Sequence, residues 1–310
     1  MTLTQPKNQI KLFGLDKYIN EMIELYNKNN LPNKVLFSGQ KGLGKSTLAY
    51  HFINYVLSQD EECSYDCNNL IIDTENHSYK TILNKSNPNF FLIDIDIDKK
   101  FIDINQIRSL IISLNKSSLN TKPRFILIDN IEYLNTNSIN ALLKVLEEPS
   151  INVYFILINN NKRILSTLLS RCLNFKVSLS NKESFIVANK LLDGNLEKFI
   201  NKDLLNYYIT PGNIYNLINF GKDNDYDLIN TNLENFLETM ITNKHYKKNK
   251  LISFMIFDFI EFYFNKISFS FSSKIFDKYS YFLKRISDTK RFNLDEETLF
   301  TEFKDDILNG

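Results

Sequence analysis

One stretch of this 310-residue chain has residue types and a spacing that fit the binding of nucleotide phosphates. Residues 39–46 read GQKGLGKS, the pattern G-x-x-x-x-G-K-[ST], and three of only eight glycines in the chain lie there. Such glycines let successive backbone N–H groups point at phosphate oxygens, and a helix that begins there adds the positive end of its dipole. We expect the following residues to bind ATP or ADP with Mg²⁺: Gly39, Gly42, Gly44, Lys45, Ser46 and Thr47.

A phosphate loop of this kind also needs a carboxylate at the end of a neighbouring strand, where it holds Mg²⁺. Asp129 follows the apolar run 125–128 and is predicted to take that role with Ser46, the alternative being an ordinary turn residue. ATP-hydrolysing motors normally carry a glutamate next. Here Asn130 follows, and an amide cannot act as a base, while Glu132 lies two residues further along. This is the first indication that nucleotide binding and hydrolysis are uncoupled.

Alternating strands and helices must position these residues. Buried-strand patterns are expected at 35–38, 90–95, 125–129, 153–158 and 175–177. Helical spacing of apolar residues is expected after the phosphate loop and at 104–114, 139–146 and 164–170, with Pro149 as a stop. This alternation predicts an α/β fold with a parallel sheet covered on both faces.

After about Ser178 the strand signal disappears, and three domains are expected. They are a nucleotide-binding domain at 1–178, a small helical domain at 179–222 and a helical domain at 223–310. In the last domain Phe254, Phe257, Ile260 and Phe264 form an apolar stripe typical of a core. The lysine-rich stretch 244–250 fits a solvated helix end better than a contact with DNA phosphates.

The composition limits the partners. With 37 basic and 36 acidic residues, the net charge of +1 gives no long-range attraction to nucleic acid or anionic membranes. The apolar stretch 251–267 is interrupted by Asp258 and Glu261, which favours a buried helix over a membrane span. Residues 1–14 lack the apolar core of a signal peptide. We expect a cytoplasmic protein without a membrane partner.

Two further motifs carry a specific resemblance. Residues 140–149 read NALLKVLEEP, and residues 169–172 read LSRC after the next strand. At this spacing they resemble bacterial clamp-loader subunits of the AAA+ class, over about residues 10–220. Residues 31–33 (LPN) and 47–50 (TLAY) are similar to the delta-prime branch of that family. The resemblance implies a P-loop AAA+ sheet domain, a helical lid domain and an all-α collar domain.

The resemblance also assigns site residues. Arg171 matches the arginine that reaches in trans into a neighbouring subunit's ATP site and neutralises charge on the transferred phosphoryl group. The alternative is an arginine that pairs with a local carboxylate. Asn159 matches the sensor-1 position, with a register uncertain by one because Asn160 and Asn161 follow. Cys172 is interpreted as a packing residue.

Two departures from the family pattern stand out. Many relatives read Ser-Pro-Gly-Arg where residues 210–213 read TPGN, so a positive charge is missing at Asn213. Many bacterial members carry four zinc-binding cysteines, whereas this region has only Cys63, Cys67 and the more distant His77. These fall short of a tetrahedral site, and no zinc is expected.

The resulting interpretation is a stator-like subunit of the clamp loader of DNA polymerase III. Its implied partners are tau/gamma-like and delta-like subunits, the sliding clamp, and primed DNA through the assembled complex. A tau/gamma-like motor that itself hydrolyses ATP is the alternative, against which Asn130 and Asn213 stand. A small-molecule kinase is a third possibility, which leaves Arg171 and the helical last third unexplained.

Overall fold

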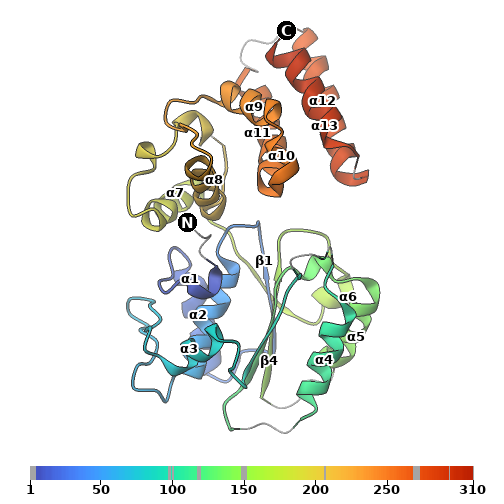
Figure 1. The fold of residues 1–310 in the computed structure, drawn as a ribbon. Coiled ribbons are helices and arrows are strands. Elements are labelled where there is room, and N and C mark those ends of the chain that lie inside the picture. The colour runs from blue at the N-terminus through green and yellow to red at the C-terminus, as the bar shows by residue number, and fades with distance from the viewer. Residues whose placement is uncertain are drawn as a thin grey trace. The chain divides into compact units, whose positions relative to one another are not determined.

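The computed structural model describes residues 5–96, 99, 101–116, 120–147, 152–205, 207–267, 273–292 and 294–309 (Figure 1). Pro149, the predicted helix stop, lies outside the described residues. The chain divides into two compact units, one of residues 1–191 with 210–214 and one of residues 192–209 with 215–310. The three-domain division with boundaries after residues 178 and 222 remains a prediction.

A five-stranded parallel β-sheet forms the centre of the first unit. Its strands are β1 (Lys34–Ser38), β2 (Phe90–Ile93), β3 (Arg124–Ile128), β4 (Val153–Asn159) and β5 (Leu173–Lys176). They lie in the order β2-β3-β4-β1-β5, and each neighbouring pair is parallel. The loops that follow β1, β3 and β4 therefore meet at one edge of the sheet. The predicted α/β fold with a parallel sheet is confirmed.

Helices cover both faces of this sheet. The first unit contains α1 (Asp16–Asn27), α2 (Lys45–Leu57), α3 (His77–Leu83), α4 (Ile104–Leu114), α5 (Thr136–Glu147), α6 (Ser166–Leu169) and α7 (Asn181–Leu191), with the 3-10 turns η1 (Pro6–Asn8) and η2 (Ile131–Tyr133). Figure 1 shows α1, α2 and α3 on one side and α4, α5 and α6 on the other. Because side chains alternate along a strand, Phe125 of β3 packs with Phe52 of α2, whereas Ile126 belongs to the opposite core with Leu142 of α5.

Most predicted elements agree with the structure to within two residues, and α4 spans the predicted 104–114. β2 ends at Ile93, two residues earlier than predicted, because Asp94 accepts a hydrogen bond from the N–H of Ile95 and one from Asn130. The helix predicted at 164–170 forms only the single turn α6.

The regular elements described in the second unit are all helices or helical turns. It contains η3 (Leu196–Lys198), η4 (Lys202–Leu204), most of α8 (Pro211–Asp223), α9 (Leu233–Thr242), α10 (His245–Lys248), α11 (Lys250–Ile267), α12 (Ser273–Phe292), α13 (Glu296–Phe303) and the π-helical turn η6 (Lys304–Leu308). Among the described residues, no helix combines the length and apolar character that a membrane crossing requires.

Helix α11 contributes three of the four predicted core residues. Phe257, Ile260 and Phe264 are almost completely buried, but Phe254 is 53% exposed, so the prediction was wrong for this residue. Helical geometry gives the reason, because Phe254 lies one turn before Asp258 and shares its solvent-facing side of the helix.

The lysine-rich stretch 244–250 is partly paired within the second unit. Lys244 and Lys247 contact the two carboxylate oxygens of Glu297 at 2.6 and 2.5 Å. These internal ion pairs agree with a solvated helix end and leave fewer free cations for a nucleic acid.

Candidate nucleotide site

The predicted phosphate-binding loop connects β1 to α2 at the carboxyl edge of the sheet. Gly42 and Gly44 have φ values of 88° and 86°, in the left-handed region that favours glycine. Gly44 is also the N-cap of α2, and no described side chain caps the helix at that point. The first N–H groups of α2 are therefore left for an anion, as the sequence motif requires.

A distant segment, residues 210–213, packs against this loop within the first unit. The hydroxyl of Thr210 donates to the carbonyl of Lys41 at 2.9 Å, and the N–H of Gly212 donates to the carbonyl of Gly42 at 2.9 Å. A Cβ on Gly212 would lie 2.8 Å from the Cα of Gly42, so only glycine permits this approach. Asn213 therefore lies beside the loop, where the family's arginine is expected, but it is uncharged.

Lys45 is 3% exposed at the start of α2. Its Nζ donates to the carbonyls of Gly39 and Gln40, at 2.9 and 2.6 Å. Burial lowers the pKa of Lys45 to about 8, and the negative charges of Asp129 and Glu132 only partly offset this effect. A buried ammonium next to the open end of a helix is suited to contact phosphate oxygens.

Ser46 and Asp129 meet from different elements, as predicted for a magnesium site. The Ser46 hydroxyl, in the first turn of α2, donates to a carboxylate oxygen of Asp129, which follows β3. Burial raises the pKa of Asp129 to about 6; the hydrogen bond from Ser46 lowers it, and the nearby charge of Asp94 raises it further. Thr47, also assigned to the nucleotide, lies half-buried in the same helical turn.

These residues fit a nucleotide with Mg²⁺. A hydroxyl and a carboxylate in contact form an oxygen donor set of the kind that Mg²⁺ prefers, and the ion usually completes its coordination with phosphates and water. The uncapped N-terminus of α2 and the Lys45 ammonium supply the positive groups for the phosphates.

Asn130 belongs to a network of amides and carboxylates beside Asp129. Its Nδ2 donates to Asp94 at 2.8 Å, and its Oδ1 accepts from Asn160 at 2.8 Å. Asn160 also donates to both carboxylate oxygens of Glu132, through its side chain at 3.1 Å and its N–H at 3.2 Å. Glu132 is thus held by Asn160, and position 130 offers no group that can accept a proton.

The structure brings Asn160 as well as Asn159 to this edge of the sheet. Asn159 is paired with Ser38 across β4 and β1, but its side chain is engaged with the backbone of Lys162. Asn160 instead reaches Asn130 and Glu132. The sequence favoured Asn159 for the sensor-1 position with a register uncertain by one, and it is the next residue, Asn160, that contacts Asn130 and Glu132.

Arg171 lies at the other edge of the sheet from the phosphate loop. It directly precedes β5, whose first residue Leu173 pairs with Val35 near the amino end of β1. Its Nη1 donates to the carbonyl of Thr167 and its Nη2 to the carboxylate of Glu147, both at 2.8 Å. The alternative role considered for this arginine was pairing with a local carboxylate, and Glu147 provides such a carboxylate. Burial raises the pKa of the adjacent Cys172 to about 11, in agreement with a packing residue.

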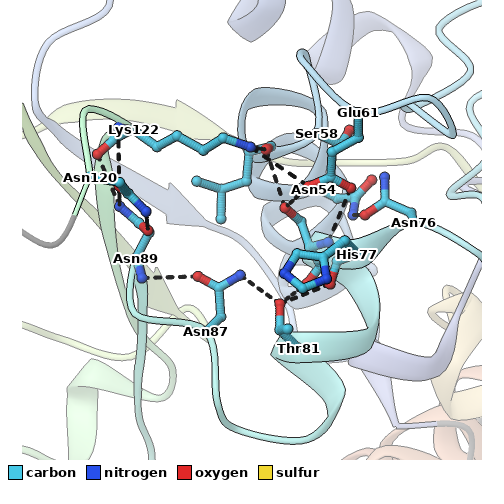
Figure 2. A network of polar contacts seen from close by, with 12 residues as sticks. Asn54, Ser58, Glu61, Asn76, His77, Thr81, Asn87, Asn89, Asn120 and Lys122 are labelled. Atoms are coloured by element: carbon cyan, nitrogen blue, oxygen red, sulfur yellow. Dashed lines mark hydrogen bonds and ion pairs between the residues drawn. The ribbon is translucent and has the colours of Figure 1, made fainter.

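Figure 2 shows a network of polar contacts that holds the segment between α2 and β2, where Cys63 and Cys67 lie. One member, Asn76, caps α3 by accepting from the N–H of Tyr79, accepts from Asn54 and donates to the carbonyl of Cys63. The labelled members are Asn54, Ser58, Glu61, Asn76, His77, Thr81, Asn87, Asn89, Asn120 and Lys122. Within the described part of the chain no group of three possible ligands could hold a metal ion. The absence of zinc remains a prediction.

Comparisons with known proteins point to one family. A family profile described as DNA polymerase III, delta subunit, matches residues 14–181. DNA polymerase III subunit delta′ of Buchnera aphidicola subsp. Baizongia pistaciae is 28% identical over 221 residues, 69% of this chain and 62% of that protein. DNA polymerase III subunit gamma of Buchnera aphidicola subsp. Acyrthosiphon pisum is 32% identical over 149 residues, 48% of this chain and 39% of that protein. The chain thus spans less than two thirds of either relative's length.

A solved gamma subunit-related protein of Thermotoga maritima superposes with a TM-score of 0.46 and 16% identity over 93% of this chain and 95% of that one. Because the family profile matches more than half of the chain, the protein belongs to the DNA polymerase III delta subunit family, in agreement with the resemblance carried by its sequence motifs.

Proposed function

We propose that this protein is a subunit of the clamp loader of DNA polymerase III that acts mainly as a stator. It binds ATP or ADP with Mg²⁺ and donates Arg171 to the ATP site of a neighbouring subunit during loading of the sliding clamp on primed DNA. The partners are tau/gamma-like and delta-like subunits in the cytoplasm. Family membership supports the assembly, because relatives carry the names delta′ and gamma.

The position of Arg171 carries this proposal. It lies at the amino edge of the sheet, whereas Lys45, Ser46 and Asp129 gather at the carboxyl edge. The arginine therefore lies at the opposite end of the strands from its own chain's phosphate site. Its side chain is 33% exposed, so a phosphate presented by another subunit has access to it.

The surroundings of Arg171 support a contact with a neighbour. Leu165, Leu169 and Leu173, within the same short segment, are 39 to 46% exposed. Exposed leucines gathered around one arginine are typical of a protein interface, because burying them against a partner is favourable.

The site around Lys45 supports binding better than hydrolysis. The buried ammonium of Lys45 and the contact between Ser46 and Asp129 support binding, whereas positions 130 and 213 carry amides instead of a base and a cation. One contact favours the motor alternative: Glu132 is held by Asn160 close enough for its charge to act on Lys45. Family membership speaks against the kinase alternative.

The test is the ATPase activity of a reconstituted clamp loader with clamp and primed DNA. We expect Arg171→Ala to slow hydrolysis at the neighbouring site by about 10³-fold, the range of arginine fingers, and Lys45→Ala to change the total rate little. Arg163→Ala is the matched control, because Arg163 is an exposed arginine in the preceding loop. If Lys45→Ala is instead the damaging change and Arg171→Ala is harmless, the chain is a motor.

A further inference from the structure

The ion pair between Arg171 and Glu147 links two elements that lie far apart in the sequence. Glu147 is the last residue of α5, and Arg171 follows α6 after the whole of β4. Their side chains are 33% and 53% exposed, and the two charged groups are 2.8 Å apart. An exposed ion pair contributes little to stability, so stability alone does not account for this contact.

The backbone next to Glu147 is hydrogen-bonded to the sheet. The Nζ of Lys34, the first residue of β1, donates to the carbonyl of Leu146 at 2.9 Å. The Leu146 side chain is fully buried in the core between α5 and the sheet. The residue before Glu147 is thus bonded to β1, the strand that pairs with β5.

Two contacts hold one side of the guanidinium. Nη1 donates to the carbonyl of Thr167 and Nη2 to Glu147. A guanidinium has five N–H donors. The two bonds use two of these donors, and a phosphate oxygen is an acceptor that the others fit.

From this geometry we infer that Glu147 is the positioning residue of Arg171, fixing the guanidinium for the phosphate of a neighbouring subunit's nucleotide. The inference rests on the proposed function. An exposed arginine side chain without such a partner samples many rotamers, and a misplacement of about 1 Å costs up to roughly 100-fold in rate. Holding the side chain in advance removes that loss.

The experiment measures kcat and KM for ATP in the reconstituted loader with clamp and primed DNA. Glu147→Ala is expected to lower kcat about tenfold and to change KM less than about twofold, because the arginine acts in the transition state. Glu147→Gln is expected to keep most of the rate, since its amide oxygen accepts the same hydrogen bond from Nη2. The double variant with Arg171→Ala should be no slower than Arg171→Ala alone, because both changes remove one function.

Glu75→Ala is the matched control, because it removes an exposed ion pair with Lys80 elsewhere in the first unit. Melting temperatures of all variants should stay within about 3 °C, which separates positioning from folding. If both Glu147 variants speed hydrolysis, Glu147 restrains the arginine instead of positioning it. If neither variant changes the rate, the ion pair has no effect on hydrolysis. Either result overturns the positioning role of Glu147 but leaves the proposed function intact. If Arg171→Ala itself has no effect, the proposed function and the inference both fall.

Discussion

The two ends of helix α2 lie in polar surroundings of opposite character. At its N-terminus, Lys45 and Asp129 are buried charges whose pKa values move in the direction that disfavours ionisation, to about 8 and about 6. Taking charges out of water without complete compensation destabilises a fold. This end is held in a form that an external phosphate and a metal ion would stabilise.

At the C-terminal end of α2 most polar groups are neutral and bond to one another. Asn54 and Asn76 are almost fully buried; Asn54 donates to Asn76, which also bonds to the backbone, while the Oδ1 of Asn54 has no partner among the described residues. Glu61 and Lys122 form an ion pair there, and Lys122 also donates to the carbonyl of Leu57 (Figure 2). Neutral amides that bond to one another stabilise a fold without presenting a charge to a ligand.

This difference distinguishes the N-terminal end of α2, the site end, from its C-terminal end, the scaffold end. Both ends are rich in buried polar side chains, so burial of polar residues alone does not identify function. What distinguishes the N-terminal end is charge that lacks full internal compensation, together with glycines in left-handed conformations. Three predictions test this comparison.

The largest effect is expected from Asn76→Ala at the scaffold end. The change leaves the N–H of Tyr79, the carbonyl of Cys63 and the amide of Asn54 without their partner. Unsatisfied buried groups of this kind should together lower the unfolding free energy by roughly 3–5 kcal/mol. Urea unfolding followed by circular dichroism measures the loss.

Asn84→Ala is the control for this change, because Asn84 is an exposed asparagine at the other end of α3. It should cost less than about 0.5 kcal/mol. The affinity of folded Asn76→Ala for ADP should equal that of the unchanged protein. A strong loss of affinity would show that the two ends of α2 are not separable.

The next largest effect is expected from Asp129→Asn at the site end. The folded-state pKa of Asp129 is about 6, above the ordinary 3.8, so the folded form binds the proton more tightly than the unfolded form. Stability is therefore lost as the pH rises from about 4 to about 6 and stays constant above that window. At pH 7 the charge costs at most about 3 kcal/mol, which the asparagine variant regains.

Unfolding experiments at pH 4 and pH 7 measure this gain, which should vanish at the lower pH. The same variant should bind ADP with Mg²⁺ more weakly, because Mg²⁺ loses its carboxylate. A variant that is no more stable at pH 7 would contradict the view that this end of α2 is destabilised for the sake of a ligand.

Local sequence patterns predicted the elements of the sheet and the phosphate loop. The G-x-x-x-x-G-K-[ST] motif and the apolar run before Asp129 are short-range signals, and the structure brings Ser46 and Asp129 into contact. Periodicity also predicted α4 to the residue. Such signals succeed because strand, loop and helix start are each determined within a few residues.

The contacts that refine the site are long-range, and the sequence did not reveal them. Thr210 and Gly212 reach the loop from far along the chain, and nothing in the TPGN motif itself indicates their partners at 41–42. Glu147 belongs to a family motif, but its pairing with Arg171 depends on how α5 and β5 meet at the sheet. In an asparagine-rich chain, no local signal singles out Asn76 or Asn160.

The smallest effect is expected from removing metal. If the polar network alone holds the segment that carries Cys63 and Cys67, a strong chelator should leave the melting temperature unchanged. Cys63→Ser should also change little, because Asn76 donates to the Cys63 carbonyl, which any residue provides. The Cys67 thiol has only a weak contact with the carbonyl of Tyr65, and partial burial together with the charge of Asp66 raises its pKa, which disfavours the thiolate that binds zinc.

Differential scanning calorimetry of the protein with and without chelator, alongside the Cys63→Ser/Cys67→Ser variant, measures this prediction. A chelator-dependent drop in the melting temperature that the double variant abolishes would mean that these thiols bind a metal, and the network would then be only part of the scaffold. Unchanged melting in all samples, together with a large loss for Asn76→Ala, would assign this end of α2 to hydrogen bonds alone. The scaffold end would then resist metal depletion, while the site end would still respond to Mg²⁺ and nucleotide.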